Sequence, residues 1–281
     1  MGVASLDDRA STIQGELAGP STATKNSRST LDSELLVADA SCPHIRALLV
    51  GCQAPVLWLQ GDQHPFLAIS QALAERTLKG SASIQTLHWL SHGSPGQLHI
   101  GDRSITTAAL IAHAQQLKNW GIKDLAIWSC SVGSDVTFIS VLEELTGATV
   151  WASDQPLGRI ADGSSHWQLT NALQTKAPSL PINASRLLAW NHQLAAPTLD
   201  SSVSPLLAAI DANTGTPSGA VGTLVSVLID SGGSLDNFAD ADGGSPAIGI
   251  IGTNLNGGTL YYSIDNGNNW SDVGTVSEAS A

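Results

Sequence analysis

Two apolar segments of the chain each end in a reactive side chain that small residues follow. The segment LHWLSHG delivers His92, and the segment IWSCSVG delivers Cys130. A cysteine becomes a strong nucleophile when a nearby base accepts its proton, and histidine serves as such a base near neutral pH. Backbone N–H groups at Gly93, Cys130 and Ser131, leading into the next expected helix, would form an oxyanion site. The two motifs therefore predict a cysteine nucleophile paired with a histidine.

The elements that must position these side chains alternate between strand and helix. Such alternation favours an α/β fold, a mostly parallel sheet with helices on both faces. Ligands and catalytic groups gather at the carboxyl ends of the strands in such sheets, so His92 and Cys130 would leave the same edge side by side. Strands are expected at 34–38, 55–60, 84–90, 124–129, 148–152 and 165–170, helices at 43–50, 65–76, 107–120 and 135–146, and a hairpin at 97–106 turning at Gly101-Asp102.

Other polar residues are weaker candidates. Asp154 follows the strand at 148–152 on the same edge, where it would line a substrate pocket and select a basic side chain, or cap a loop. Cys42 and Cys52 have apolar neighbours and are expected to be inert. His88 and His92 would lie ~13 Å apart at ~3.3 Å per residue, too far to share one zinc ion. We therefore expect His88 to be an interior residue satisfied by a hydrogen bond.

The charge of the chain divides it into two parts. The formal net charge over 281 residues is −12, which argues against a nucleic-acid groove or an anionic membrane surface. All 12 Lys and Arg lie at or before Arg186, whereas nine of the 24 carboxylates follow it. No apolar run reaches the roughly 18 residues that a membrane span needs. The three cysteines are too few for a disulfide framework. The charge step predicts a module boundary near this point.

The two ends of the chain differ from its middle. Residues 1–30 are rich in Ser, Thr, Gly and Ala without an apolar core, which predicts a disordered leader and shows no secretion signal. From about Ala196, β-prone runs at 221–229, 247–251 and 259–264 are separated by Gly- and Asn-rich turns, which is typical of a β-sandwich, here incomplete. Asp236, Asp240 and Asp242 would bind calcium or form a solvated acidic loop.

The motifs LHWLSHGSPGQLHIGD, LAIWSCSVG and LTGATVWASD resemble the bacterial DUF4347 family of domains of unknown function, over about half of the chain. That family is found at the N-terminus of large surface or secreted proteins and is placed in the caspase-like (clan CD) cysteine peptidase superfamily. The resemblance implies that His92-Gly93 and Cys130 match the histidine and cysteine of that superfamily. The segment from APTLDSSVSPLL to NGGTLYYSIDNGNNW resembles cadherin- or immunoglobulin-like repeats of giant bacterial adhesins.

The expected organisation is a leader at 1–30, a caspase-like α/β domain at 31–194 and a partial β-sandwich repeat at 195–281. The expected function is a cysteine endopeptidase-type domain of a secreted or surface protein, with its own chain or a neighbouring surface protein as the polypeptide substrate. No cofactor is expected for the α/β domain, and calcium is considered for the C-terminal module. The alternative is a non-enzymatic capping or adhesion module with an inert cysteine. A cytoplasmic location would follow if the chain is a truncated product.

Overall fold

The structure is a computed structural model that describes residues 32–60, 63–160, 162–170, 176–211, 214–229, 237–241 and 248–277. The predicted leader at 1–30 and the candidate calcium ligands Asp236 and Asp242 lie outside the described residues.

The centre of the fold is a five-stranded parallel sheet, as the alternation of strand and helix predicts. Its strands follow the spatial order β2-β1-β3-β7-β8, and every neighbouring pair is parallel. Alternate side chains of each strand enter the apolar layers above and below the sheet, which explains why the strands read as nearly continuous apolar runs. The strands span Glu34–Asp39 (β1), Val56–Leu59 (β2), Thr86–Leu90 (β3), Asp124–Trp128 (β7) and Thr149–Ala152 (β8).

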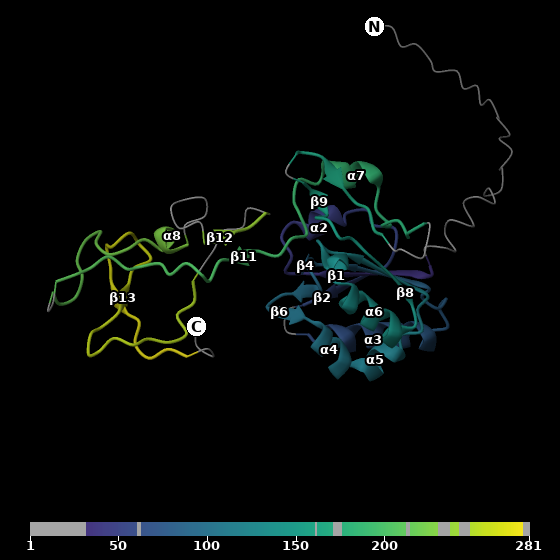
Figure 1. Cartoon of the computed structure of the whole chain (residues 1–281), viewed down its shortest axis with the longest axis horizontal. Helices are drawn as coiled ribbons and strands as arrows, with labels where there is room; N and C mark the ends of the chain where they lie inside the picture. Colours follow the sequence, from purple (N-terminus) through teal and green to yellow (C-terminus); the bar gives the residue numbers. More distant parts are fainter. Residues whose placement is uncertain are drawn as a thin grey trace, which may run out of the picture.

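Helices cover both faces of this sheet (Figure 1). On one face, α3 (Pro65–Leu78), α4 (Thr107–Ala112), α5 (Ala114–Lys118) and α6 (Val136–Thr146) contribute Phe66, Leu110, Leu117 and Phe138 to one apolar core. On the other face, α2 (Ile45–Leu48) and α7 (Ala184–Ala189) contribute Ile45, Leu48 and Leu187 to a second core, which also holds Cys42 and Cys130.

The single helix predicted at 107–120 is interrupted at His113. Thr106 caps its start, accepting a hydrogen bond from the Ala109 N–H. His113 leaves helical geometry, and its ring packs against His64 at 4.1 Å between centroids. The expected helix is therefore the pair α4 and α5.

A small antiparallel sheet follows β3 and carries His92. It is formed by β4 (His92–Ser94), β5 (Gln97–Ile100) and β6 (Arg103–Ile105), so the predicted hairpin turning at Gly101-Asp102 is present. A second pair, β9 (Gly158–Arg159) and β10 (Ser165–His166), stands beyond β8. The expected strand at 165–170 is thus reduced to β10 and a single bridge between Thr170 and Ala152.

The part that follows residue 196 has little regular structure. Its described residues form two short antiparallel pairs, β11 (Thr198–Leu199) with β12 (Phe238–Ala239) and β13 (Tyr261–Tyr262) with β14 (Ser271–Asp272). The strand expected at 221–229 is wrong for Val225–Leu228, which form the short helix α8 through local hydrogen bonds. A β-prone run forms a strand only when it pairs through backbone hydrogen bonds with a neighbouring strand. The described pairs in this part are only two residues long, so a β-sandwich remains a prediction.

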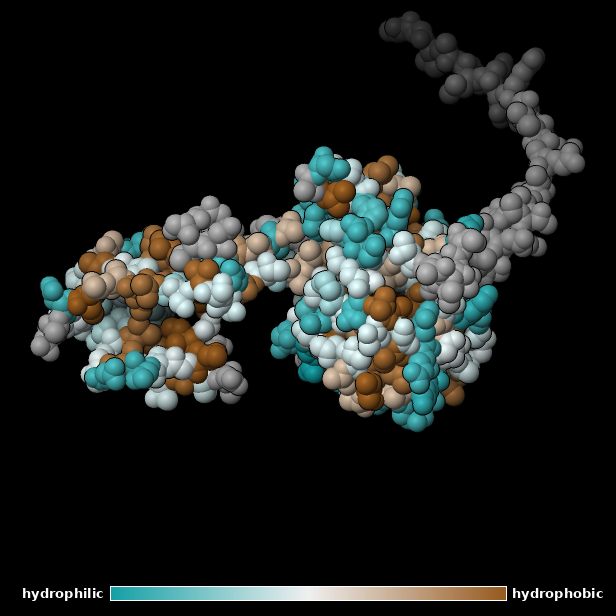
Figure 2. All heavy atoms as spheres, in the orientation of Figure 1, coloured by the Kyte–Doolittle hydropathy of each residue, from teal (hydrophilic) through white to brown (hydrophobic). Residues whose placement is uncertain are grey.

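Apolar side chains are exposed on this C-terminal part, as the brown surface in Figure 2 shows. They include Leu206, Ile210, Leu224 and Ile264. Within the described ranges, no helix is long and apolar enough to cross a membrane.

Candidate functional site

His92 and Cys130 stand at the same edge of the central sheet. In the register of β3 and β7, Leu90 lies opposite Trp128, and each candidate follows two residues later. The hydroxyl oxygens of the intervening Ser91 and Ser129 are 3.2 Å apart and fully buried. The ends of the two strands are therefore packed directly against each other.

Gly93 is required here by space and not by backbone conformation. Its φ is not in the left-handed region. A Cβ atom on it would lie 2.7 Å from both Ser129 Cβ and Val132 Cγ2, and 3.0 Å from the Cys130 carbonyl oxygen. Only a residue without a side chain lets the segment after His92 approach the segment that carries Cys130.

The Cys130 thiol is buried and contacts the backbone of Leu157. Its Sγ accepts a hydrogen bond from the Leu157 N–H at 3.0 Å and lies 3.5 Å from the Leu157 carbonyl oxygen. Leu157 directly precedes β9, so a loop beyond β8 covers the Cys130 thiol. An N–H directed at sulfur stabilises its anionic form, which is the reactive one.

The His92 ring contacts Cys42, which its apolar neighbours led us to expect as an inert residue. Its Nε2 atom lies 3.4 Å from Cys42 Sγ. Cys42 follows β1, which is the other neighbour of β3, so three strands deliver Cys42, His92 and Cys130 to one edge. The sequence did carry a signal for this contact, because Cys42 also follows a predicted strand.

Two backbone amides at this edge converge on a single carbonyl oxygen. The N–H groups of Gly93 and Cys130 both donate to the carbonyl oxygen of Leu194, at 3.0 and 3.2 Å. The N–H of Ser131, the other oxyanion candidate, donates instead to the Gln155 carbonyl at 3.1 Å. Two amides directed at one oxygen, at the sheet edge that carries His92 and Cys130, form a donor arrangement of the kind that acyl transfer uses.

The segment that supplies this carbonyl lies along β9 as an added strand. The Leu194 N–H donates to the Leu157 carbonyl at 3.0 Å, and the Arg159 N–H donates to the His192 carbonyl at 2.7 Å. Gly158 pairs with Gln193 in an antiparallel bridge, and a Cβ on Gly158 would collide with the His192 carbonyl oxygen. The absence of a side chain at Gly158 therefore allows the segment 192–194 to pack against β9.

A cavity of about 380 Å³ opens beside His92. Asp39, His99, Pro197 and Asp240 also line it. Asp39 is buried and accepts hydrogen bonds from the N–H and hydroxyl of Ser41, at 2.9 and 2.6 Å, and from the Gly101 N–H at 3.1 Å. It thereby ties the loop that carries Cys42 to the β5–β6 hairpin.

His99 pairs with His92 across the β4–β5 hairpin. Burial, and next the charge of His92, lower the pKa of His99. Its Nε2 lies 3.0 Å from Ser94 Oγ and its Nδ1 lies 3.1 Å from Ser104 Oγ. Burial and the neighbouring His92 therefore favour the neutral form of His99, and two hydroxyl groups fix the position of its ring.

The remaining candidates lie elsewhere or contribute differently. Asp154 is exposed, and its backbone carbonyl accepts a hydrogen bond from Ser134 Oγ at 3.2 Å. His88 is fully buried, and its Nδ1 accepts a hydrogen bond from Trp128 Nε1 at 3.1 Å, which confirms the interior role. Among the described residues, no group of three metal-ligating side chains is present, and Asp240 is the only candidate calcium ligand that is described.

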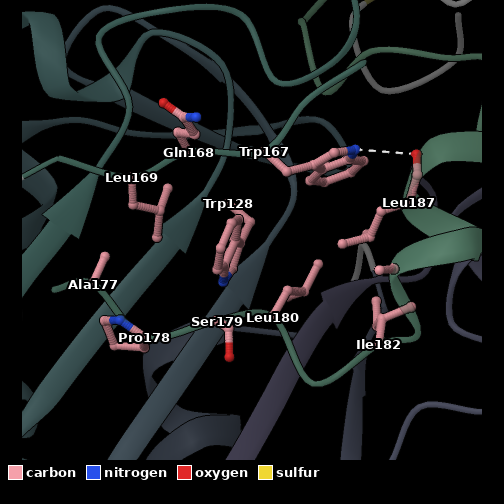
Figure 3. A pocket seen from close by; sticks show the side chains of 11 residues that line it. Trp128, Trp167, Gln168, Leu169, Ala177, Pro178, Ser179, Leu180, Ile182 and Leu187 are labelled. Carbon is pink, nitrogen blue, oxygen red and sulfur yellow. Dashed lines mark hydrogen bonds between the residues drawn. The ribbon is translucent and has the colours of Figure 1, made fainter.

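A larger cavity, about 480 Å³, lies over the end of β7 (Figure 3). Trp128, Trp167 and Leu180 line it, and Trp167 Nε1 donates to the Leu187 carbonyl at 3.2 Å. Neither His92 nor Cys130 lines this cavity, so it is separate from the sheet-edge site.

The described residues before the C-terminal part thus have an α/β fold in which a thiol and an imidazole follow neighbouring parallel strands. The chain belongs to the family described as a domain of unknown function, DUF4347, whose sequence pattern matches residues 35–194, more than half of the chain. No curated protein and no solved structure matches it.

Proposed function

We propose that the α/β domain is a caspase-like cysteine endopeptidase-type domain in which Cys130 is the nucleophile and His92 is the base. The observation that carries this proposal is the convergence of the Gly93 and Cys130 amides on one carbonyl oxygen. A carbonyl held in this way becomes more electrophilic, and the same two amides stabilise the anion that forms after attack.

Cys130 is preferred to Cys42 as the nucleophile because of its own amide. The Cys130 N–H binds the carbonyl oxygen, which places the carbonyl carbon next to the residue that bears the thiol. The N–H of Cys42 donates instead to the Asp39 carbonyl at 3.3 Å. Cys42 therefore contacts the base but takes no part in the pair of amides that binds a carbonyl.

The setting of the domain is part of the proposal and rests on resemblance. The C-terminal part resembles repeats of bacterial surface adhesins, which supports a secreted or cell-surface protein whose substrate is its own chain or a neighbouring surface protein. The apolar side chains exposed on this part, Leu206 and Ile264 among them, support a module that packs against further chain. Calcium binding at Asp236, Asp240 and Asp242 is tested by calorimetric titration with calcium, with an Asp240→Asn variant as control.

The second candidate is a non-enzymatic capping or adhesion module. The burial of Cys130 and its two contacts with Leu157 favour it, since a structural cysteine has the same surroundings. This candidate predicts that Cys130 reacts with no electrophile while the domain is folded.

The deciding experiment is labelling with a peptide that carries a leucine followed by a thiol-reactive ketone, with the modified residue identified by peptide mass spectrometry. It uses a Gly158→Ala variant of the full chain, in which the new Cβ collides with the His192 carbonyl and the φ of +103° opposes a side chain, so that the segment 192–194 is displaced. We expect label on Cys130 in this variant, little in the wild type, where Leu194 fills the site, and none when Cys130→Ala or His92→Gln is added to Gly158→Ala. Cys52→Ala is the matched control, because Cys52 is half-buried and burial raises the pKa of its thiol.

Two results would overturn the proposal. Equal labelling of Gly158→Ala with and without Cys130→Ala would show that the label does not report this site. Label on Cys42 and not on Cys130 would show that the nucleophile is wrongly assigned.

A further inference from the structure

We infer that the peptide bond between Leu194 and Ala195 is the substrate of this domain, cleaved within its own chain. This inference rests on the proposed function and names its substrate. It begins from the Leu194 carbonyl, which occupies the two-amide site at Gly93 and Cys130. An oxyanion site filled by a carbonyl of the same chain marks that carbonyl as the one positioned for attack.

The residues before this bond are held as a peptidase holds an extended substrate. Leu194 and His192 form backbone hydrogen bonds with Leu157 and Arg159, at and just before β9, which is the way β-strand addition binds peptides. The His192 ring stacks on His44 at 3.8 Å between centroids. Backbone and side chain together fix the position of the segment before the bond.

The Leu194 side chain defines what the site accepts at this position. It is completely buried in the apolar core that also contains Cys42, Cys130, Leu157 and Trp190. A charged side chain there would lose its hydration without a partner, at a high cost in free energy. The site therefore selects an apolar residue before the cleaved bond. The sequence had instead suggested that Asp154 selects a basic side chain.

The residues after the bond stay beside Gly93, through a bridge to Ala195 and a hydrogen bond from the Ala196 N–H at 3.4 Å, before the chain becomes exposed. Exposure increases along the chain from Leu194, which is buried, to Pro197, which is exposed. Ala196 and Pro197 line the cavity of about 380 Å³ beside His92, which gives the leaving amine and an incoming water a route. The match to the family also ends at residue 194. Cleavage here would separate the α/β domain from the C-terminal part.

The reaction consumes one water molecule and needs no other reactant. Cys130 Sγ attacks the Leu194 carbonyl carbon while His92 takes the thiol proton, and the carbonyl oxygen becomes an anion held by the two amides. Collapse of this intermediate breaks the bond to the Ala195 nitrogen, which takes the proton from His92. Water, deprotonated by His92, then attacks the Leu194 thioester, and the thiolate leaves and regains the proton, releasing the Leu194 carboxylate.

The test is a time course of the purified full chain, read by intact mass and by N-terminal sequencing. We expect a fragment that begins at Ala195 and its absence after Cys130→Ala, with Cys52→Ala behaving as the wild type. Leu194→Asp should slow cleavage by about a hundredfold or more, and Leu194→Met by about tenfold at most. Near-ultraviolet circular dichroism checks that each variant is folded.

The Gly158→Ala variant separates this inference from the proposed function. It displaces the segment 192–194, so it should abolish cleavage while increasing the labelling of Cys130 by the leucine ketone. An intact wild-type chain with a labelled Cys130 in Gly158→Ala would overturn the inference and leave a peptidase whose site the segment merely covers. Cleavage at another bond would also overturn it. No cleavage and no labelling in either protein would refute both proposals.

Discussion

Gly93→Ala tests whether the close approach of the two strand ends holds the site together. The new methyl would lie 2.7 Å from Ser129 Cβ and Val132 Cγ2, whereas carbon atoms in contact prefer about 3.5–4.0 Å. The strand ends must therefore separate by about 1 Å, and overpacking of this kind costs about 1–3 kcal/mol. The Leu194 carbonyl then loses at least one amide hydrogen bond, worth about 0.5–1.5 kcal/mol. Together we expect a loss of about 2–4 kcal/mol in the free energy of unfolding.

Thermal unfolding followed by tryptophan fluorescence measures this loss, in a Cys130→Ala background so that cleavage does not interfere. For a domain of this size the expected fall in Tm is about 5–15 °C. Gly80→Ala is the matched control, because nothing lies within 4 Å of its new methyl and only its left-handed backbone, with φ at +65°, opposes the change. That strain costs about 1 kcal/mol. A fall for Gly93→Ala no larger than that for Gly80→Ala would refute the steric argument.

Three further predictions concern the surroundings of the site. The pKa of His99 is lowered by burial and by the charge of His92, so the unfolded chain takes up protons at higher pH than the folded one. Stability should therefore fall as the pH drops below about 6.5, and less so in His99→Gln, as urea midpoints at several pH values will show. Asp39→Asn should cost about 1.5–3 kcal/mol by weakening hydrogen bonds to a buried carboxylate, measured by urea unfolding against Asp162→Asn, an exposed loop carboxylate. Trp128→Phe should cost at least about 1–3 kcal/mol, because the buried His88 Nδ1 loses its donor; an unchanged urea midpoint would contradict this.

The sheet and the position of the candidate site at its edge could be predicted because they depend on local signals. Apolar runs of strand length alternate with helical periodicity, and a parallel sheet is the arrangement that buries both faces of such strands. The end of each apolar run also fixes where a side chain leaves the sheet. The sequence therefore predicts that His92 and Cys130 each follow a strand at the same edge of the sheet. The pairing of β3 with β7 then brings the two positions side by side.

What could not be predicted depends on contacts between distant segments. The contact between Cys42 and His92 exists because β1 lies between β2 and β3, an order that no local pattern specifies. The interruption at His113 depends on packing against His64, which is 49 positions away. The strand-like run at 221–229 contains α8, and none of the described strands pairs with it, so intrinsic strand preference decides little there.

The Leu194 carbonyl connects these long-range contacts to chemistry. Both lone pairs of its oxygen are used by amides from separate strand ends, one of them within the parallel bridge between Gly93 and Ala195. One of these amides belongs to Gly93, the residue after His92. The other belongs to Cys130 itself. After cleavage the new Leu194 carboxylate would remain in the same two-amide site, where its charge strengthens both hydrogen bonds. The product would then block the site that made it, so we expect a single turnover within the chain and little cleavage of an added peptide with the sequence of residues 190–197, as chromatography of that peptide will show.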